Sequence, residues 1–107
     1  LQLARAAAYL CRDGAHPLRA GQPLMTERQT RRINSLMLTC GTYDAAGEFA
    51  YRIGLPCKSG VGGGILAVVP DQLTLVVWSP ALDETGNSVL GQKALELFTR
   101  RTGLSIF

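Results

Sequence analysis

Four glycines within five residues, at positions 60, 62, 63 and 64, precede the apolar segment 65–69 and constrain the fold more than any other feature. Glycine weakens a strand because it has no side chain to pack and loses much conformational entropy on folding. Such a run is favoured where a second backbone, a ligand or a catalytic group approaches the main chain closely. We therefore expect a glycine-lined strand that forms part of a site.

Three segments have the patterns of β-strands. Residues 48–53 alternate between apolar and more polar positions, which is typical of a strand with one wetter face. Residues 64–69 and 73–78 are almost continuously apolar, as in strands that are covered on both faces. The three residues 70–72 between them have the length of a hairpin loop. The sequence therefore predicts antiparallel strands.

Helices are predicted before and after the strands. Residues 1–13 are rich in alanine and stop at Gly14, whereas Thr26 to Gln29 form a capping box that begins a second helix. A third helix follows the potential cap Gly86-Asn87-Ser88. The apolar stripes expected on the second and third helices are Ile33, Leu36, Met37 and Cys40, and Leu90, Ala94, Leu97 and Phe98.

The predicted fold class is therefore α/β of the α+β type, with an antiparallel sheet covered by helices on both faces. Three consecutive strands flanked by helices would leave the sheet edges exposed unless further strands or another subunit completed the sheet. The chain also begins with Leu1 in place of Met. We expect a partial domain, cut from a longer protein.

Composition and charge exclude several classes of protein. With 47% hydrophobic and 18% charged residues, the 107-residue chain has the composition of a globular domain with a modest core. The net charge of +3 is too small to indicate a polyanionic partner, and the cluster Arg28, Arg31 and Arg32 is typical of a solvated helix face. No apolar run is long enough to span a bilayer. We expect neither a nucleic-acid nor a membrane partner.

The cysteines and the single histidine argue against a metal site. Cys11, Cys40 and Cys57 are odd in number and widely spaced, with no Cys-x-x-Cys pair, and His16 is the only histidine. Such cysteines are typical of reduced thiols in a cytosolic protein. We expect no metal, no cofactor and a cytoplasmic location.

The tripeptide Lys58-Ser59-Gly60 favours acyl transfer over phosphate binding. A phosphate-binding loop needs its Lys-Ser/Thr after the glycines and before a helix, whereas here the glycines follow and a strand is predicted. The tripeptide resembles the Lys-Thr/Ser-Gly strand motif of penicillin-recognising serine enzymes, beside which a backbone N–H stabilises an oxyanion. A penicillin-binding or β-lactamase-like enzyme is therefore one hypothesis.

A longer stretch carries a more specific resemblance. Residues 36–65, LMLTCGTYDAAGEFAYRIGLPCKSGVGGGI, closely resemble the serine-dependent glutaminase family, and residues 78–83 and 86–88 extend the match. The segment 3–17 is also similar, although Cys11–Gly14 and His16 depart from the usual pattern of its loop. The resemblance thus covers essentially all 107 residues.

The resemblance implies hydrolysis of L-glutamine to L-glutamate and ammonia, through a serine acyl-enzyme on a β-lactamase-like fold. The family uses a Ser-x-x-Lys pair as nucleophile and base, and no such pair occurs in this chain. Residues 1–107 would then be the C-terminal segment of a glutaminase catalytic domain, inactive when isolated. The resemblance also implies that the parent protein is a homo-oligomer, a dimer or a tetramer.

The site residues follow from the resemblance in the same way. Tyr43 matches a family tyrosine that contacts both the substrate and the attacking serine, and a phenol can donate and accept the proton needed by departing ammonia. Val61 matches a valine whose backbone contacts the substrate. Four further residues are expected to support the site: Lys58, Ser59, Gly60 and Gly62. A third hypothesis, a non-catalytic module that binds a partner through apolar faces, also remains open.

Overall fold

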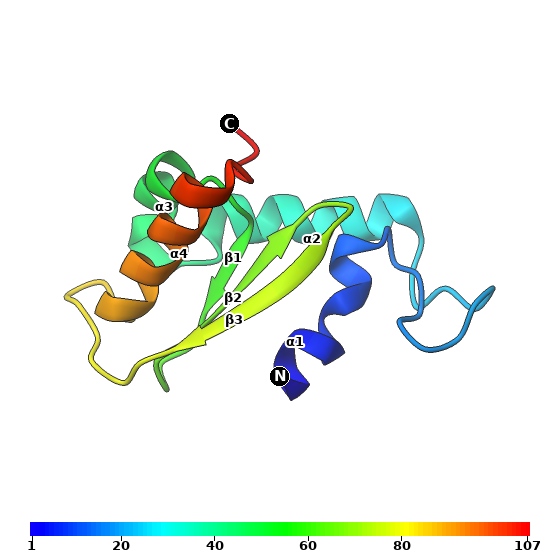
Figure 1. Cartoon of the computed structure of the whole chain (residues 1–107), viewed down its shortest axis with the longest axis horizontal. Coiled ribbons are helices and arrows are strands. Elements are labelled where there is room, and N and C mark those ends of the chain that lie inside the picture. The colour runs from blue at the N-terminus through cyan, green and yellow to red at the C-terminus, as the bar shows by residue number, and fades with distance from the viewer.

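A computed structural model describes all 107 residues. Its elements in chain order are α1 (Gln2–Ala6), η1 (Ala8–Cys11), α2 (Glu27–Cys40), η2 (Tyr43–Ala45), α3 (Ala46–Arg52), β1 (Cys57–Ser59), β2 (Gly64–Val69), β3 (Leu73–Trp78) and α4 (Val89–Thr102). Figure 1 shows α1 and α4 near opposite ends of the sheet, with α2 running along it. No helix combines the length and the apolar character that crossing a membrane requires.

The strands form one antiparallel sheet in the order β1-β2-β3. Ser59 pairs with Ile65 across the first turn, and Val69 pairs with Leu73 across the second. The 70–72 hairpin predicted from the sequence is thereby confirmed, with Asp71 at a positive φ of 64° that suits a tight turn. The antiparallel arrangement is confirmed as well.

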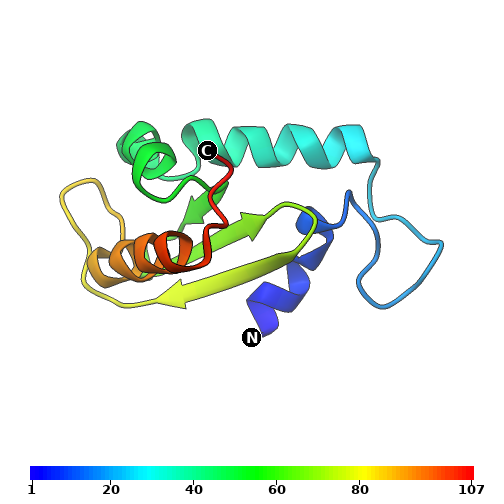
Figure 2. The same ribbon diagram turned by 45° about the horizontal axis from the view of Figure 1, so that its top comes forward.

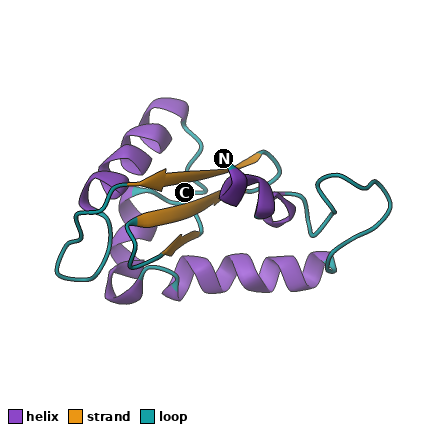
Figure 3. Ribbon diagram, turned by 90° about the horizontal axis from the view of Figure 1, so that it is seen from below, coloured by secondary structure: helices purple, strands orange, loops and turns teal.

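Helices cover both faces of this sheet, as predicted. Successive strand residues point to opposite faces, so β2 contributes to two cores. Ile65 lies with Leu95 of α4 and the side chains of α3 on one face, whereas Val68 packs with Leu10 and Met37 on the other. Figure 3 shows the strands between α4 on one side and α2 on the other. The hairpin is therefore held rigidly between helical layers.

The prediction of a strand over residues 48–53 is wrong, because residues 48–52 belong to helix α3 and Ile53 is its C-cap. Phe49 and Ile53 are buried four residues apart on one helical face, while Tyr51 is 86% exposed. The i,i+4 ion pair between Glu48 and Arg52 is also a helical contact. The first strand is instead β1, which contains Lys58 and Ser59.

Three other helix predictions need correction. On α2 the expected stripe is wrong in part, since Met37 is buried whereas Leu36 and Cys40 are exposed. The predicted helix over residues 1–13 divides into α1 and the 3₁₀ turn η1, and this turn buries Leu10 and Cys11. On α4 the stripe expected through Leu90 and Leu97 is wrong, since both side chains are about half exposed. The buried residues of α4 are Gly91, Leu95 and Thr99.

The position of β3 also differs from the prediction. Its apolar sequence indicated a strand covered on both faces, but β3 lies at the sheet edge and most of its side chains are only half-buried. Trp78, expected in the core, is 69% exposed, and its indole N–H donates to the Gly62 carbonyl at 2.8 Å. Apolar composition alone did not distinguish a central strand from an edge strand.

The end of α2 is placed directly against β1. The capping box predicted at Thr26 and Gln29 is present in both directions, with distances of 3.1 and 2.9 Å. At the other end, a Cβ on Gly41 would overlap the carbonyl oxygen of Cys57, so only glycine allows this close approach. The Ser59 amide then donates to the Gly41 carbonyl at 3.0 Å. This contact brings the next residues, including Tyr43, beside β1.

Candidate functional site

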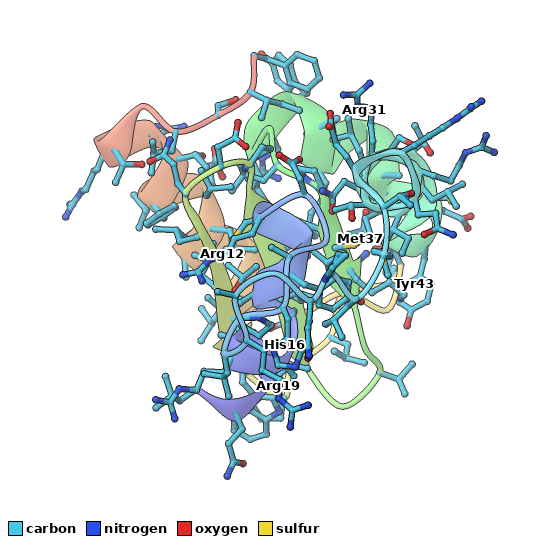
Figure 4. All side chains as sticks on the ribbon, turned by 90° about the vertical axis from the view of Figure 1, so that its right-hand side faces the viewer. Arg12, His16, Arg19, Arg31, Met37 and Tyr43 are labelled. Carbon is cyan, nitrogen blue, oxygen red and sulfur yellow. The ribbon has the colours of Figure 1, made fainter.

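Tyr43 begins η2, between α2 and α3, in an uncommon backbone conformation. Its φ of 57° is left-handed, which costs free energy for a residue with a side chain and has to be held by surrounding contacts. Its side chain is 41% exposed, and its hydroxyl donates to the Ser59 carbonyl at 3.4 Å. Figure 4 shows Tyr43 at the margin of the molecule, with the buried Met37 further inward. The phenol is therefore partly exposed and in contact with β1.

Lys58 lies beside the same tyrosine. Its ammonium is 5.0 Å from the centroid of the Tyr43 ring, which is within cation–π distance, and it donates to the Ser59 carbonyl. That carbonyl thus accepts from both side chains. The structure brings together two predicted site residues and leaves a positive charge at the phenol.

Ser59 is buried and its hydroxyl is already used. The side chain is 3% exposed and donates to Oδ1 of Asn87. The backbone of Ser59 contributes more to the site, since its carbonyl receives the Tyr43 hydroxyl. The structure therefore places the Ser59 carbonyl against Tyr43, while its hydroxyl is buried and already donates to Asn87.

Gly60, Gly62 and Gly63 lie in the loop between β1 and β2, and only Gly64 belongs to a strand, as the first residue of β2, which corrects the prediction of a glycine-lined strand. Two backbone hydrogen bonds close this loop, from Gly60 N–H to the Gly64 carbonyl and from Gly63 N–H to the Gly60 carbonyl. Gly63 has a φ of 96°, and a Cβ there would overlap the Ser79 carbonyl. Gly60 and Gly62 have open space around them. Within this run, Gly63 is the one position where contacts within the chain exclude any side chain.

Val61 lies at the tip of this loop and is 77% exposed. Its backbone N–H donates to no group of the chain. Gly63, two residues later, holds the loop against the end of β3, because the Ser79 amide donates to the Gly63 carbonyl at 3.0 Å. The arrangement presents an unused amide donor two residues from the carbonyl that binds Tyr43.

Asn87 is part of this region, although the sequence indicated only a helix cap. The cap of α4 is Ser88, whose hydroxyl accepts from Gly91 N–H at 3.1 Å. The fully buried Asn87 side chain accepts from the Ser59 hydroxyl and donates to the Thr42 carbonyl at 3.0 Å. Figure 2 shows the 79–88 segment that carries it, running from β3 to α4. No local pattern revealed these contacts, because the partners are 28 and 45 residues away.

The turn before Asn87 is organised by Asp83. Its carboxylate accepts hydrogen bonds from the hydroxyl and amide of Thr85, from the Asn87 amide and from the Gln92 side chain, at 2.6–3.1 Å. These donors, with the Thr85 hydroxyl the strongest, lower the pKa of Asp83 from its ordinary 3.8 to about 2. The charged form of Asp83 therefore stabilises the turn.

The chain contains no serine paired with a lysine. Its two lysines are Lys58 and Lys93, and neither donates to a serine hydroxyl. The three-residue spacing of a Ser-x-x-Lys pair is also absent from the sequence. The chain thus carries the Ser59 carbonyl, the Tyr43 phenol and the free Val61 amide, without an activated nucleophile.

Curated glutaminases are similar to this chain over its whole length. The glutaminase of Methylorubrum extorquens (strain PA1) is 58% identical over 106 residues, which are 99% of this chain and 34% of that protein. The glutaminase of Aliivibrio fischeri (strain MJ11) is 56% identical over 107 residues, or 100% and 35% of the two chains. The chain thus spans about a third of the length of these curated relatives.

Solved structures show the same fold. A probable glutaminase from Bacillus subtilis, complexed with 6-diazo-5-oxo-L-norleucine, matches with a TM-score of 0.90 and 38% identity over 98% of this chain and 36% of that one. The Bacillus subtilis glutaminase in covalent complex with 5-oxo-L-norleucine matches with a TM-score of 0.87 and 39% identity, over 92% and 36%. The glutaminase family model matches residues 1–107 without interruption. From its sequence and its fold, the chain belongs to the glutaminase family.

Proposed function

We propose that residues 1–107 form the C-terminal part of a glutaminase catalytic domain that hydrolyses L-glutamine to L-glutamate and ammonia. The observation that carries the proposal is the Tyr43 hydroxyl, bound to the Ser59 carbonyl beside the unused Val61 amide. The match of the family over the whole chain supports the same reading. The attacking serine and its lysine partner then lie outside this chain.

The proposed reaction is an acyl transfer in two steps. A serine hydroxyl attacks the side-chain amide carbon of glutamine, and the carbon–nitrogen bond breaks to give an acyl-enzyme and ammonia. Water then attacks the acyl carbon and releases glutamate, and the serine regains its proton. The Bacillus subtilis glutaminase, which forms a covalent complex by reaction with 6-diazo-5-oxo-L-norleucine, supports a nucleophile of this kind in the family.

Tyr43 and Val61 have separate roles in this proposal. The phenol of Tyr43 binds near the reacting amide and passes a proton to the leaving nitrogen. The Val61 N–H donates to the oxygen that becomes negative during attack, together with the N–H of the serine itself. Lys58 supplies positive charge beside the phenol, and Gly60 and Gly62 leave room for substrate at the loop. No cofactor or metal takes part.

The location and assembly of the longer protein belong to the same proposal. We infer a β-lactamase-like fold for the longer protein from its family. We also infer a cytoplasmic location, because two of the three cysteines are buried and all three are unpaired. Exposed apolar side chains such as Leu90 and Leu97 support contacts with the remaining polypeptide or with further subunits of a dimer or tetramer. The Lys-Ser-Gly tripeptide by itself no longer favours a penicillin-binding enzyme, since the family match extends over every residue.

A chimera tests the proposal directly. This chain would replace the matched third of the Methylorubrum extorquens glutaminase, and ammonia release from L-glutamine would be measured for the chimera, that relative and the isolated 107-residue chain. We expect activity in the chimera and in the relative, and none in the isolated chain. A folded chimera without activity contradicts the function. Ammonia release by the isolated chain, above a serine-blocked control, contradicts the external nucleophile.

Acid pH is expected to reveal the stabilising role of Asp83 in this chimera. A carboxylate whose pKa is lowered by folding stabilises the protein above its unfolded pKa, and this contribution is lost as pH falls through the folded value. The relevant window is from about pH 3.8 down to about pH 2. Between pH 5 and pH 2.5, Asp83→Asn should lose less unfolding free energy than the unmodified chimera.

Denaturant titrations at both pH values measure this difference. Glu84→Gln is the matched control, because Glu84 is the exposed neighbour and its carboxylate makes no hydrogen bond within the chain. The control should keep the full acid dependence. An identical loss of stability in Asp83→Asn and in the unmodified chimera would show that the turn does not depend on the ionised carboxylate.

A further inference from the structure

Asn87 connects the two parts of the candidate site. Its side-chain amide donates to the Thr42 carbonyl at 3.0 Å and to the Thr85 hydroxyl at 2.8 Å, and its Oδ1 accepts from the Ser59 hydroxyl. Thr42 lies directly before Tyr43, and Ser59 is the residue whose carbonyl receives the Tyr43 hydroxyl. One buried amide therefore touches both neighbours of the phenol.

Asn87 is buried, and its backbone is fixed by the neighbouring turn. Asn87 is 0% exposed, so water cannot substitute for a lost partner without entering the core. Its backbone is fixed as well, because its amide and carbonyl both bond to Asp83, at 3.1 and 2.8 Å. The Asn87 side chain is thus held on a turn that is fixed by Asp83, and it fixes the positions of Thr42 and Ser59 in turn.

The conformation of Tyr43 requires such a restraint. A positive φ is unfavourable for tyrosine, and η2 has no side-chain cap to hold its first residue. The Tyr43 ring also lies 3.6 Å from where a Cβ on Gly86 would be, so the turn carrying Asn87 packs against the ring itself. The direct bond from the phenol to the Ser59 carbonyl is long, at 3.4 Å, and cannot fix the ring alone.

We propose that Asn87 is the positioning residue for the Tyr43 hydroxyl, which it holds at a fixed place relative to β1 through Thr42 and Ser59. The inference rests on the proposed function, in which that hydroxyl transfers a proton. Removal of the Asn87 amide would release the Thr42 carbonyl and the Ser59 hydroxyl together. The phenol would then sample positions away from the leaving nitrogen, which slows the chemical step more than it weakens substrate binding.

A double-mutant cycle in the active chimera tests this coupling. We expect Asn87→Ala to lower kcat roughly 10- to 100-fold with KM changed by less than about threefold. In a Tyr43→Phe background, which lacks the hydroxyl, the same substitution should lower kcat by less than about threefold. Thr99→Ala is the control for loss of a buried hydroxyl, since Thr99 is 4% exposed and donates only within α4. It should reduce Tm and leave kcat unchanged.

The outcomes separate the inference from the function on which it rests. A folded chimera without glutamine hydrolysis, or Tyr43→Phe with full activity, contradicts the proposed function. If both are as expected but Asn87→Ala lowers kcat equally in both backgrounds, or lowers only Tm, the positioning role is wrong. If Asn87→Ala does not fold, Ser59→Ala enters the same cycle, because its hydroxyl bonds only to Asn87. If Ser59→Ala lowers kcat by the same factor with and without Tyr43→Phe, the inference is also wrong.

Discussion

Tyr43→Phe is expected to lower kcat of the chimera by about 10²–10⁴-fold, the range that general acid–base catalysis contributes. The substitution removes one oxygen and leaves the ring, so the packing against Gly86 and the contact with the Lys58 ammonium are retained. Only the bond to the Ser59 carbonyl is lost, and its length of 3.4 Å indicates a small contribution to stability. The loss should therefore fall on the reaction rate, with Tm almost unchanged.

Steady-state ammonia release and thermal unfolding of the same preparations measure this prediction. Tyr51→Phe is the matched control, because Tyr51 is 86% exposed on α3 and its hydroxyl bonds to no group of the chain. The control should keep full activity. Equal kcat values for Tyr43→Phe and Tyr51→Phe would remove the phenol from the mechanism.

Val61→Pro is expected to reduce kcat by about 10²–10³-fold, or about 2.7–4 kcal/mol of transition-state stabilisation, as for loss of one oxyanion donor. Proline has no N–H, so the substitution deletes the proposed donor at the tip of the β1–β2 loop. The amide makes no bond within the chain, and the side chain is 77% exposed. The fold should therefore lose little when the donor is removed.

Val61→Ala provides the comparison, since it keeps the N–H and shortens the side chain. We expect its kcat to stay within about threefold of the unmodified chimera, because the proposed contact uses the backbone. Thermal unfolding of both variants shows whether the loop is intact. If alanine and proline lower kcat to the same extent, the side chain and not the amide makes the contact.

The candidate site could be predicted in part from the sequence. The long motif from Leu36 to Ile65 indicated Tyr43 and Val61 together, and the structure places both at the surface beside β1. Their chemical roles stay predictions until the substitutions are measured. Asn87 was missed because its importance depends on partners far away in the chain, which no local spacing reveals. The loop geometry of the glycines was missed for a similar reason.

Local signals in the sequence determined the starts and turns of this protein. The capping box at Thr26, the hairpin at 70–72 and the cap before α4 all depend on groups within a few residues of one another, as does Gly103, the left-handed C-cap that ends α4. Such short-range hydrogen bonds and backbone preferences are encoded by adjacent residues. They form in the same way whatever the chain packs against.

Tertiary packing decided the rest. Residues 48–53 are compatible with both a period of 2 and a period of 3.6, and burial of Phe49 and Ile53 together against Leu95 selected the helix. The buried face of α4 was set by the close approach of Gly91 to Ile65, at 3.2 Å for an added Cβ. Whether an apolar side chain is buried depends on which surface is available to cover it. That surface comes from distant parts of the chain and is not a property of the segment.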